Sequence, residues 1–122
     1  MDAKGTTFAD VEDLRRYNRA VFHGTALERA LNVGDNGLGA WGMSTVAGTG
    51  PCVALPKIEV LEGTGTTSRQ PLRLVRVHLG TRTVDCQCRD ISPPGICDLN
   101  PDACKALEIT PPWSGPVKWV WL

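Results

Sequence analysis

The stretch "CQCRDISPPGICDLNPDAC", residues 86–104, contains four of the five cysteines in the chain, together with three aspartates, three prolines and one glycine. Apolar and polar residues alternate up to residue 90 and predict a strand, because strand side chains point to opposite faces in turn. The prolines and glycine of residues 93–95 predict a turn. The segment from residue 98 has the pattern of a short helix. The informative feature of this stretch is therefore the order strand, loop and helix, and its cysteine content matters less.

The helix is predicted from "DLNPDACKALEI", residues 98–109. Asn100 is the expected N-cap, and Pro101 stands at the first helical position, where its missing N–H does no harm. Cys104 and Leu107 are spaced to face inward. The loop at residues 93–95 is therefore followed by a short helix with one side against the interior.

A hairpin is predicted on the N-terminal side of the loop. "PLRLVRVHLG" (71–80) and "TVDCQCRD" (83–90) both alternate, and a short turn separates them. The first has one slip at Leu74–Val75, which predicts a bulge. In the second, Val84, Cys86 and Cys88 share the inward face and Asp85 points outward.

Further strands are expected on both sides of this region. "CVALP" (52–56), "KIEVLEG" (57–63) and "GPVKWVWL" (115–122) are predicted as strands, the last with Val117, Trp119 and Trp121 on one face. Residues 7–22 are predicted as an amphipathic helix. The glycine-rich segment 23–52 lacks the Lys-Ser/Thr ending of a phosphate-binding loop, so no nucleotide site is expected.

The totals restrict the class of protein. A length of 122 residues suggests one domain, and a formal net charge of zero argues against nucleic acid as a partner. There is no apolar run of signal-peptide or membrane-span type. We expect a soluble protein that does not enter a membrane, located in the cytoplasm or a virion.

The cysteines leave two alternatives open. Cys86, Cys88, Cys97 and Cys104 do not have the close pairwise spacing of a structural zinc site, so no metal and no other cofactor is expected. In an oxidising compartment, Cys86 or Cys88 could pair with Cys97 or Cys104. In a reducing one, all would be buried thiols. A catalytic cysteine would need a histidine partner, which the sequence does not indicate.

Five segments in order resemble the double-psi β-barrel of the expansin, barwin and RlpA-like (rare lipoprotein A) group. They are "GLGAWG" (37–42), "CVALP" (52–56), "LVRVHLGTRTVDCQCRD" (74–90), "PPGICDLNPDACKAL" (93–107) and "GPVKWVWL" (115–122). The resemblance implies a mainly β fold, a small six-stranded double-psi β-barrel with an N-terminal helix and a second short helix. It divides the chain into an N-terminal helical extension, residues 1–24, and a barrel, residues 25–122.

The resemblance also draws attention to Asp90. It matches the aspartate that follows the second hairpin strand, which in glycan-active barrels lines the groove and acts as acid or base or holds the sugar. Hydrolysis ordinarily needs a second carboxylate, and Asp35, Asp85 and Asp98 are the candidates. Asp98 matches a family aspartate whose usual role is structural, at the start of the helix. A structural role for Asp90, accepting backbone N–H groups at a turn, is the alternative.

Two departures from the family pattern separate the functional hypotheses. The histidine of RlpA-like enzymes would fall near Cys52, and neither His23 nor His78 matches it; Trp41 replaces a common family cysteine. The first hypothesis is a barrel that binds, and possibly cleaves, peptidoglycan or a related polysaccharide, with Asp90 as the catalytic group. Asp35, Trp41 and Trp113 would then contact the sugar.

The second hypothesis is a non-catalytic structural or interaction module, for example a phage-tail component. Its partners would be other protein chains, and assembly into an oligomer is compatible with it. Arg73, Arg76, Arg82 and Arg89 are spaced to form a basic face for an acidic partner, although solvated surface is the usual meaning of such a pattern.

Overall fold

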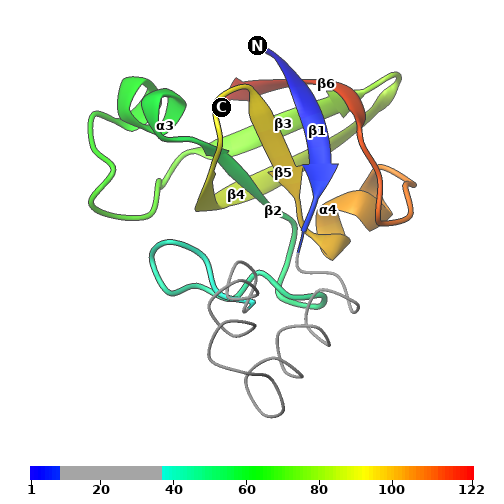
Figure 1. Cartoon of the computed structure of the whole chain (residues 1–122), viewed down its shortest axis with the longest axis horizontal. Helices are drawn as coiled ribbons and strands as arrows, with labels where there is room; N and C mark the ends of the chain where they lie inside the picture. The colour runs from blue at the N-terminus through cyan, green and yellow to red at the C-terminus, as the bar shows by residue number, and fades with distance from the viewer. Residues whose placement is uncertain (9–36) are drawn as a thin grey trace, which may run out of the picture.

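The computed structural model describes residues 1–8 and 37–122. Within them six strands form a closed barrel in the order β1-β5-β2-β4-β3-β6, with β6 pairing back onto β1. Figure 1 shows the barrel with two short helices attached to it. The elements are β1 (Asp2–Thr7), β2 (Cys52–Pro56), α3 (Lys57–Thr64), β3 (Leu74–Leu79), β4 (Arg82–Ser92), β5 (Ile96–Leu99), α4 (Pro101–Ala106) and β6 (Gly115–Trp121).

The mainly β prediction and the six-stranded barrel are confirmed. The sheet is mixed: β1–β5 and β2–β4 are parallel, and the other four pairs are antiparallel. No helix in the described ranges has the length and apolar composition that crossing a lipid bilayer requires.

The hairpin and its inward face are as predicted. β3 and β4 pair in regular register from Leu74–Gln87 to Leu79–Arg82. Val84, Cys86 and Cys88 point into the barrel with less than a tenth of their surface exposed. The bulge expected at Leu74–Val75 was wrong, because β3 begins at Leu74 and the pairing with β4 shows no shift.

The register shift lies instead on the other side of β4. Val53 of β2 pairs with Cys88 and Ala54 pairs with Asp90, so Arg89 is an extra residue on β4. A β-bulge of this kind bends the strand and changes the direction of one side chain. Side chains therefore alternate regularly before and after the bulge. The side chain of Arg89 points away from the barrel and reaches Ser44 and Thr49.

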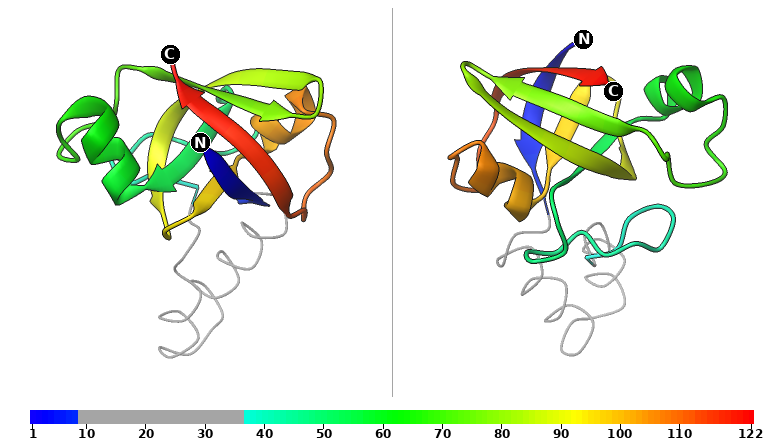
Figure 2. Two further views of the ribbon diagram at one scale, coloured as in Figure 1. Left: turned by 90° about the horizontal axis from the view of Figure 1, so that it is seen from above. Right: turned by 180° about the vertical axis from the view of Figure 1, so that it is seen from behind.

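The strand expected over residues 57–63 was wrong, because these residues form α3. Apolar and polar residues alternate here over too few positions to distinguish a strand from a helix. The helix ends at Gly65, whose positive φ of 83° lets its N–H reach the Leu61 carbonyl at 2.8 Å. Only Val60 of this helix is buried, so α3 projects from the barrel (Figure 2).

The extension assigned to residues 1–24 was wrong at its start. Asp2–Thr7 form β1, which joins β5 to β6 and closes the barrel. Residues 9–22 of the predicted N-terminal helix lie outside the described residues.

α4 begins with the capping residues that the sequence predicted. Asn100 is the N-cap, its side chain accepts the Ala103 N–H at 2.9 Å, and Pro101 begins the helix. Ala103, Cys104 and Leu107 are fully buried and join the core. The helix packs against β2, β4 and β5, so the stretch that begins in β4 also returns to cover that strand.

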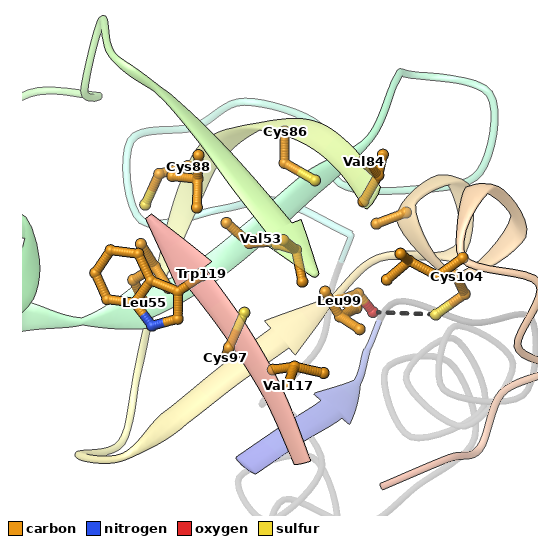
Figure 3. Close-up of a cluster of buried hydrophobic side chains, with 14 of the residues drawn as sticks. Val53, Leu55, Val84, Cys86, Cys88, Cys97, Leu99, Cys104, Val117 and Trp119 are labelled. Carbon is orange, nitrogen blue, oxygen red and sulfur yellow. Dashed lines mark hydrogen bonds between the residues drawn. The ribbon is translucent and has the colours of Figure 1, made fainter. Parts of the chain in front are cut away.

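The core fills the barrel with small and medium side chains. Figure 3 shows inward residues of β2, β4, β5, β6 and α4 around this interior. All five cysteines are buried thiols, which matches the second of the two alternatives for them. Four of them belong to the main core, and Cys52 packs with Phe8 and Ala54 in a second, small apolar cluster.

Candidate functional site

Asp90 and Asp98 lie on either side of Ala54. Ala54 of β2 pairs with Asp90 of β4 on one side and with Asp98 of β5 on the other. Residues paired across neighbouring strands have side chains on the same face of the sheet. Ala54 belongs to the apolar cluster outside the main core, so both carboxylates lie on the outer face of the barrel. We call Asp90, Ala54 and Asp98 the aspartate row.

The aspartate row continues onto β1 through Thr6. Thr6 pairs with Asp98, and its hydroxyl donates a hydrogen bond to Asp98 Oδ1 at 2.7 Å. A hydroxyl that donates to a carboxylate favours its ionised form. Asp98 is thus held toward β1, and the start of α4 is capped by Asn100.

Asp90 is half-buried and interacts with its own strand. Its Oδ1 accepts the N–H of Ile91 at 2.9 Å, and its backbone carbonyl faces the Cys88 thiol at 3.6 Å. The backbone contact that the structural alternative required is therefore present, while part of the side chain stays exposed. Both roles remain compatible with this position.

The middle of the aspartate row is covered. Ala54 is 2% exposed and packs with Phe8 and Cys52. Cys52 itself is fully buried, and burial raises the pKa of its thiol to about 12, with Arg89 opposing the rise. A thiol with this pKa is protonated near neutrality, so burial disfavours the thiolate form of Cys52.

The bulge residue Arg89 organises residues 37–51, the described part of the glycine-rich segment, which we call the glycine-rich loop. Arg89 is 6% exposed. Its guanidinium donates to the carbonyls of Ser44 and Thr49, both at 2.8 Å, and its Nε donates to Gln87 Oε1 at 3.0 Å. A Cβ at Gly39 would collide with the Arg89 carbonyl oxygen, which accounts for glycine there. The sequence pattern predicted Arg89 on a basic surface face and gave no sign of this role.

Asp102 anchors the same loop from α4. Its carboxylate accepts the N–H groups of Gly48 and Gly50 at 2.8–2.9 Å. Asn100 adds two more contacts, since its amide donates to the carbonyls of Thr45 and Gly50, each at 3.0 Å. The loop is therefore fixed to the barrel from both β4 and α4.

The two candidate tryptophans lie in different places. Trp113 is half-buried and lies over Gly5 and Gly115, a pair of facing glycines on β1 and β6. It also lines a hollow of about 340 Å³ together with Thr6, which connects it to the aspartate row. Trp41 is packed against the core and donates from Nε1 to the Thr67 carbonyl at 3.0 Å.

The remaining predicted residues are not brought to the row. Asp85 forms an exposed ion pair with Arg76, at 2.8 and 3.1 Å, and the Arg76 guanidinium lowers the pKa of the Asp85 carboxyl. Asp35 lies outside the described residues. Among residues 1–8 and 37–122, no three histidine, cysteine, aspartate or glutamate side chains are grouped closely enough to hold a metal ion.

Comparisons with known proteins show the fold. No protein-family model matches the sequence, and no curated protein matches it. Among solved structures, the chain is similar to the Streptomyces papain inhibitor (SPI), with a TM-score of 0.55 and 20% sequence identity, over 98% of this chain and 93% of that one. At this identity the similarity extends to the barrel fold and no further.

Proposed function

We propose that this chain is a double-psi β-barrel of the RlpA-like and expansin type that binds cell-wall glycan, peptidoglycan or a related polysaccharide, on its outer face. The observation that carries the proposal is the register that puts Asp90 and Asp98 on either side of Ala54. The closed mixed barrel with its two parallel pairs supports the fold assignment.

The aspartate row suits contact with sugar hydroxyls. Neighbouring strands lie about 4.8 Å apart, so the Cα atoms of Asp90 and Asp98 are about 10 Å apart. Carboxylates at this spacing accept hydrogen bonds from hydroxyl groups of successive sugar positions. The hollow lined by Thr6 and Trp113 continues the row with an aromatic ring, on which the apolar face of a sugar can stack.

Hydrolysis would require the two carboxyl groups to come closer than their strands place them. Inverting glycosidases hold theirs about 6.5–9.5 Å apart, with a water between one of them and the sugar, whereas the Cα atoms of Asp90 and Asp98 are about 10 Å apart and Thr6 holds Asp98 on the side of β1. Asp90 would protonate the leaving glycosidic oxygen. Asp98, hydrogen-bonded by Thr6, would take a proton from the attacking water, whose oxygen forms the new bond to the anomeric carbon. Phe8 and Cys52 cover Ala54 between the two carboxylates, which restricts access to a glycosidic bond there. We therefore propose glycan binding as the main function and cleavage as an additional one.

Insoluble peptidoglycan tests the proposal directly. The wild type is expected to sediment with it, and Asp90→Asn and Asp98→Asn are each expected to weaken this binding several-fold. Asp85→Asn is the matched control, since Asp85 is an exposed carboxylate on the same strand as Asp90 but is paired with Arg76. Release of soluble fragments by the wild type and not by Asp90→Asn would add catalysis. Failure of the wild type to sediment would reject the proposal.

A non-catalytic protein-binding module, as in a tail or other particle, is the second candidate. Two observations favour it: each carboxylate has a structural partner, in Ile91 N–H and the Thr6 hydroxyl, and the named structural neighbour is a papain inhibitor. Inhibition of papain by the purified chain, without binding to peptidoglycan, would favour this candidate.

A further inference from the structure

A hollow of about 360 Å³ lies beside the C-terminal part of α3. Its lining residues belong to the end of the helix and to the chain that leads into β3. These two segments project together from the barrel (Figures 1 and 2). Its volume falls in the range of small-molecule sites, about 300–1,000 Å³. The charged groups in its wall are Glu62, Arg69 and Arg73.

Arg73 is held in place before any ligand arrives. Its Nη1 donates to the Gly63 carbonyl at 2.8 Å, and its Nε donates to the Leu122 carbonyl at 3.1 Å. Its guanidinium also lies 5.7 Å from the centre of the Trp121 ring, a cation–π distance. A guanidinium has five N–H donors, so Arg73 keeps three for a ligand.

Arg69 and Glu62 complete the charge of the hollow. Neither makes a hydrogen bond or ion pair with any residue that the structure describes. The side chains of the wall therefore carry more positive than negative charge, which favours an anionic group over a neutral one.

We propose that this hollow binds a carboxylate group carried by an acidic polysaccharide. A planar carboxylate matches the fork of a guanidinium with two parallel hydrogen bonds. Beside the arginines, the Gln70 amide and an apolar rim at Leu72, which is 94% exposed, provide contacts for hydroxyls and for a sugar face. The inference rests on the proposed function and narrows its substrate to glycans with acidic groups.

The position of the hollow supports a shared ligand. Gln70 Nε2 donates to Gln87 Oε1 at 3.3 Å, which ties the wall of the hollow to β4. Gln87 and Asp90 pair with Cys52 and Ala54, which are two residues apart on β2, so they are separated by about 7 Å along the sheet. A polysaccharide chain with its acidic group in the hollow therefore reaches the aspartate row.

Titration of the purified chain with trigalacturonate, followed by calorimetry, tests the inference. Its trimethyl ester is the matched ligand, with the same sugars and no charge. We expect the ester to bind at least fivefold more weakly than the acid. Arg69→Gln is expected to lower the affinity for the acid about tenfold, as for loss of one charge-assisted contact, and Glu62→Gln is expected to raise it.

Arg82→Gln is the matched control, since Arg82 is an exposed arginine outside the hollow that pairs with Glu108. It should bind trigalacturonate as the wild type does. Thermal unfolding of each variant separates lost binding from lost folding, and Arg69 is preferred to Arg73 for this reason. Competition by inorganic phosphate at equal ionic strength, stronger than competition by acetate, would contradict the assignment to a carboxylate.

The outcomes separate this inference from the proposed function. Equal binding of acid and ester, or wild-type affinity in Arg69→Gln, overturns the inference, even if peptidoglycan binding still depends on Asp90. Loss in Arg69→Gln with no effect of Asp90→Asn or Asp98→Asn supports the hollow and rejects the aspartate row.

Discussion

Asn100 and Cys52 are joined in both directions: Asn100 Oδ1 accepts the Cys52 N–H at 3.0 Å, and the Asn100 N–H donates to the Cys52 carbonyl at 3.1 Å. The remaining side-chain contacts of Asn100 reach α4 and the glycine-rich loop. One fully buried amide therefore connects β2, a helix and a loop.

Replacing this amide should be among the most damaging single changes. Asn100→Ala leaves several buried backbone groups without partners, at about 1–3 kcal/mol each before relaxation, so we expect a loss of at least about 3 kcal/mol in the free energy of unfolding. Urea denaturation measures it. Gln70→Ala, which removes an exposed amide, should change the same quantity by less than about 0.5 kcal/mol. Similar losses in both variants would contradict the central role of Asn100.

Arg89 should hold the glycine-rich loop in place. Arg89→Met removes a buried guanidinium that donates to Ser44, Thr49 and Gln87, and we expect about 2–4 kcal/mol of destabilisation. Amide hydrogen exchange over residues 44–50 should become faster relative to exchange in β3. Arg82→Met, on the same strand but exposed, serves as the control. Unchanged exchange in the loop would mean that Arg89 does not organise it.

Gly39 should be intolerant of any side chain. Gly39→Ala would place a methyl group against the Arg89 carbonyl oxygen, which is backbone and part of a bulge, so it cannot move aside at low cost. Overpacking of this kind typically costs about 1–3 kcal/mol. Thermal unfolding compares it with Ala40→Ser, an exposed position in the same loop that should be neutral. Equal melting temperatures would show that the loop adapts.

The buried thiols should make stability fall in alkaline solution. Burial raises the pKa of Cys88 and Cys97 from 9.0 to about 12, so above pH 9 the unfolded chain loses protons that the folded chain retains. Stability is then fully present below pH 9 and declines from pH 9 to about 12, by about 1.4 kcal/mol per pH unit for each such cysteine. Urea denaturation between about pH 8 and 10.5 measures how steeply the free energy of unfolding falls with pH.

Variants assign this slope to the thiols. Cys97→Ala should reduce it, although the smaller side chain lowers stability at every pH. Val77→Ala, also a fully buried core position, should lower stability without changing the slope. A slope that is the same in both variants would assign the alkaline loss to other groups.

Local chemistry was enough to predict the central part of the fold. Alternation over residues 83–90 gave β4 and its inward cysteines, and the Asn100–Pro101 pair gave the start of α4. These features depend on a few adjacent residues. They hold wherever the chain packs, because strand alternation and helix capping act within one turn or one strand.

Predictions failed where the local signal was short or absent. "KIEVLEG" contains only three alternating residues, and Gly65 as a left-handed C-cap was the unused sign of a helix. β1 has no apolar pattern at all in "DAKGTT". It becomes a strand because β5 and β6 leave edges whose backbone groups need partners, and those edges come from residues about 90 or more positions away in the chain.

The sequence by itself determined the hairpin, the loop, the capped helix and the alternation that turns the cysteines inward. Which residues meet depends on the tertiary structure: the barrel order brings Asp90 and Asp98 to either side of Ala54, and a one-residue bulge directs the Arg89 side chain toward the glycine-rich loop. The difference lies in how far apart in the chain the interacting residues are. Side-chain alternation and capping arise between neighbours in the chain, whereas strand pairing and register arise only when distant segments close one barrel.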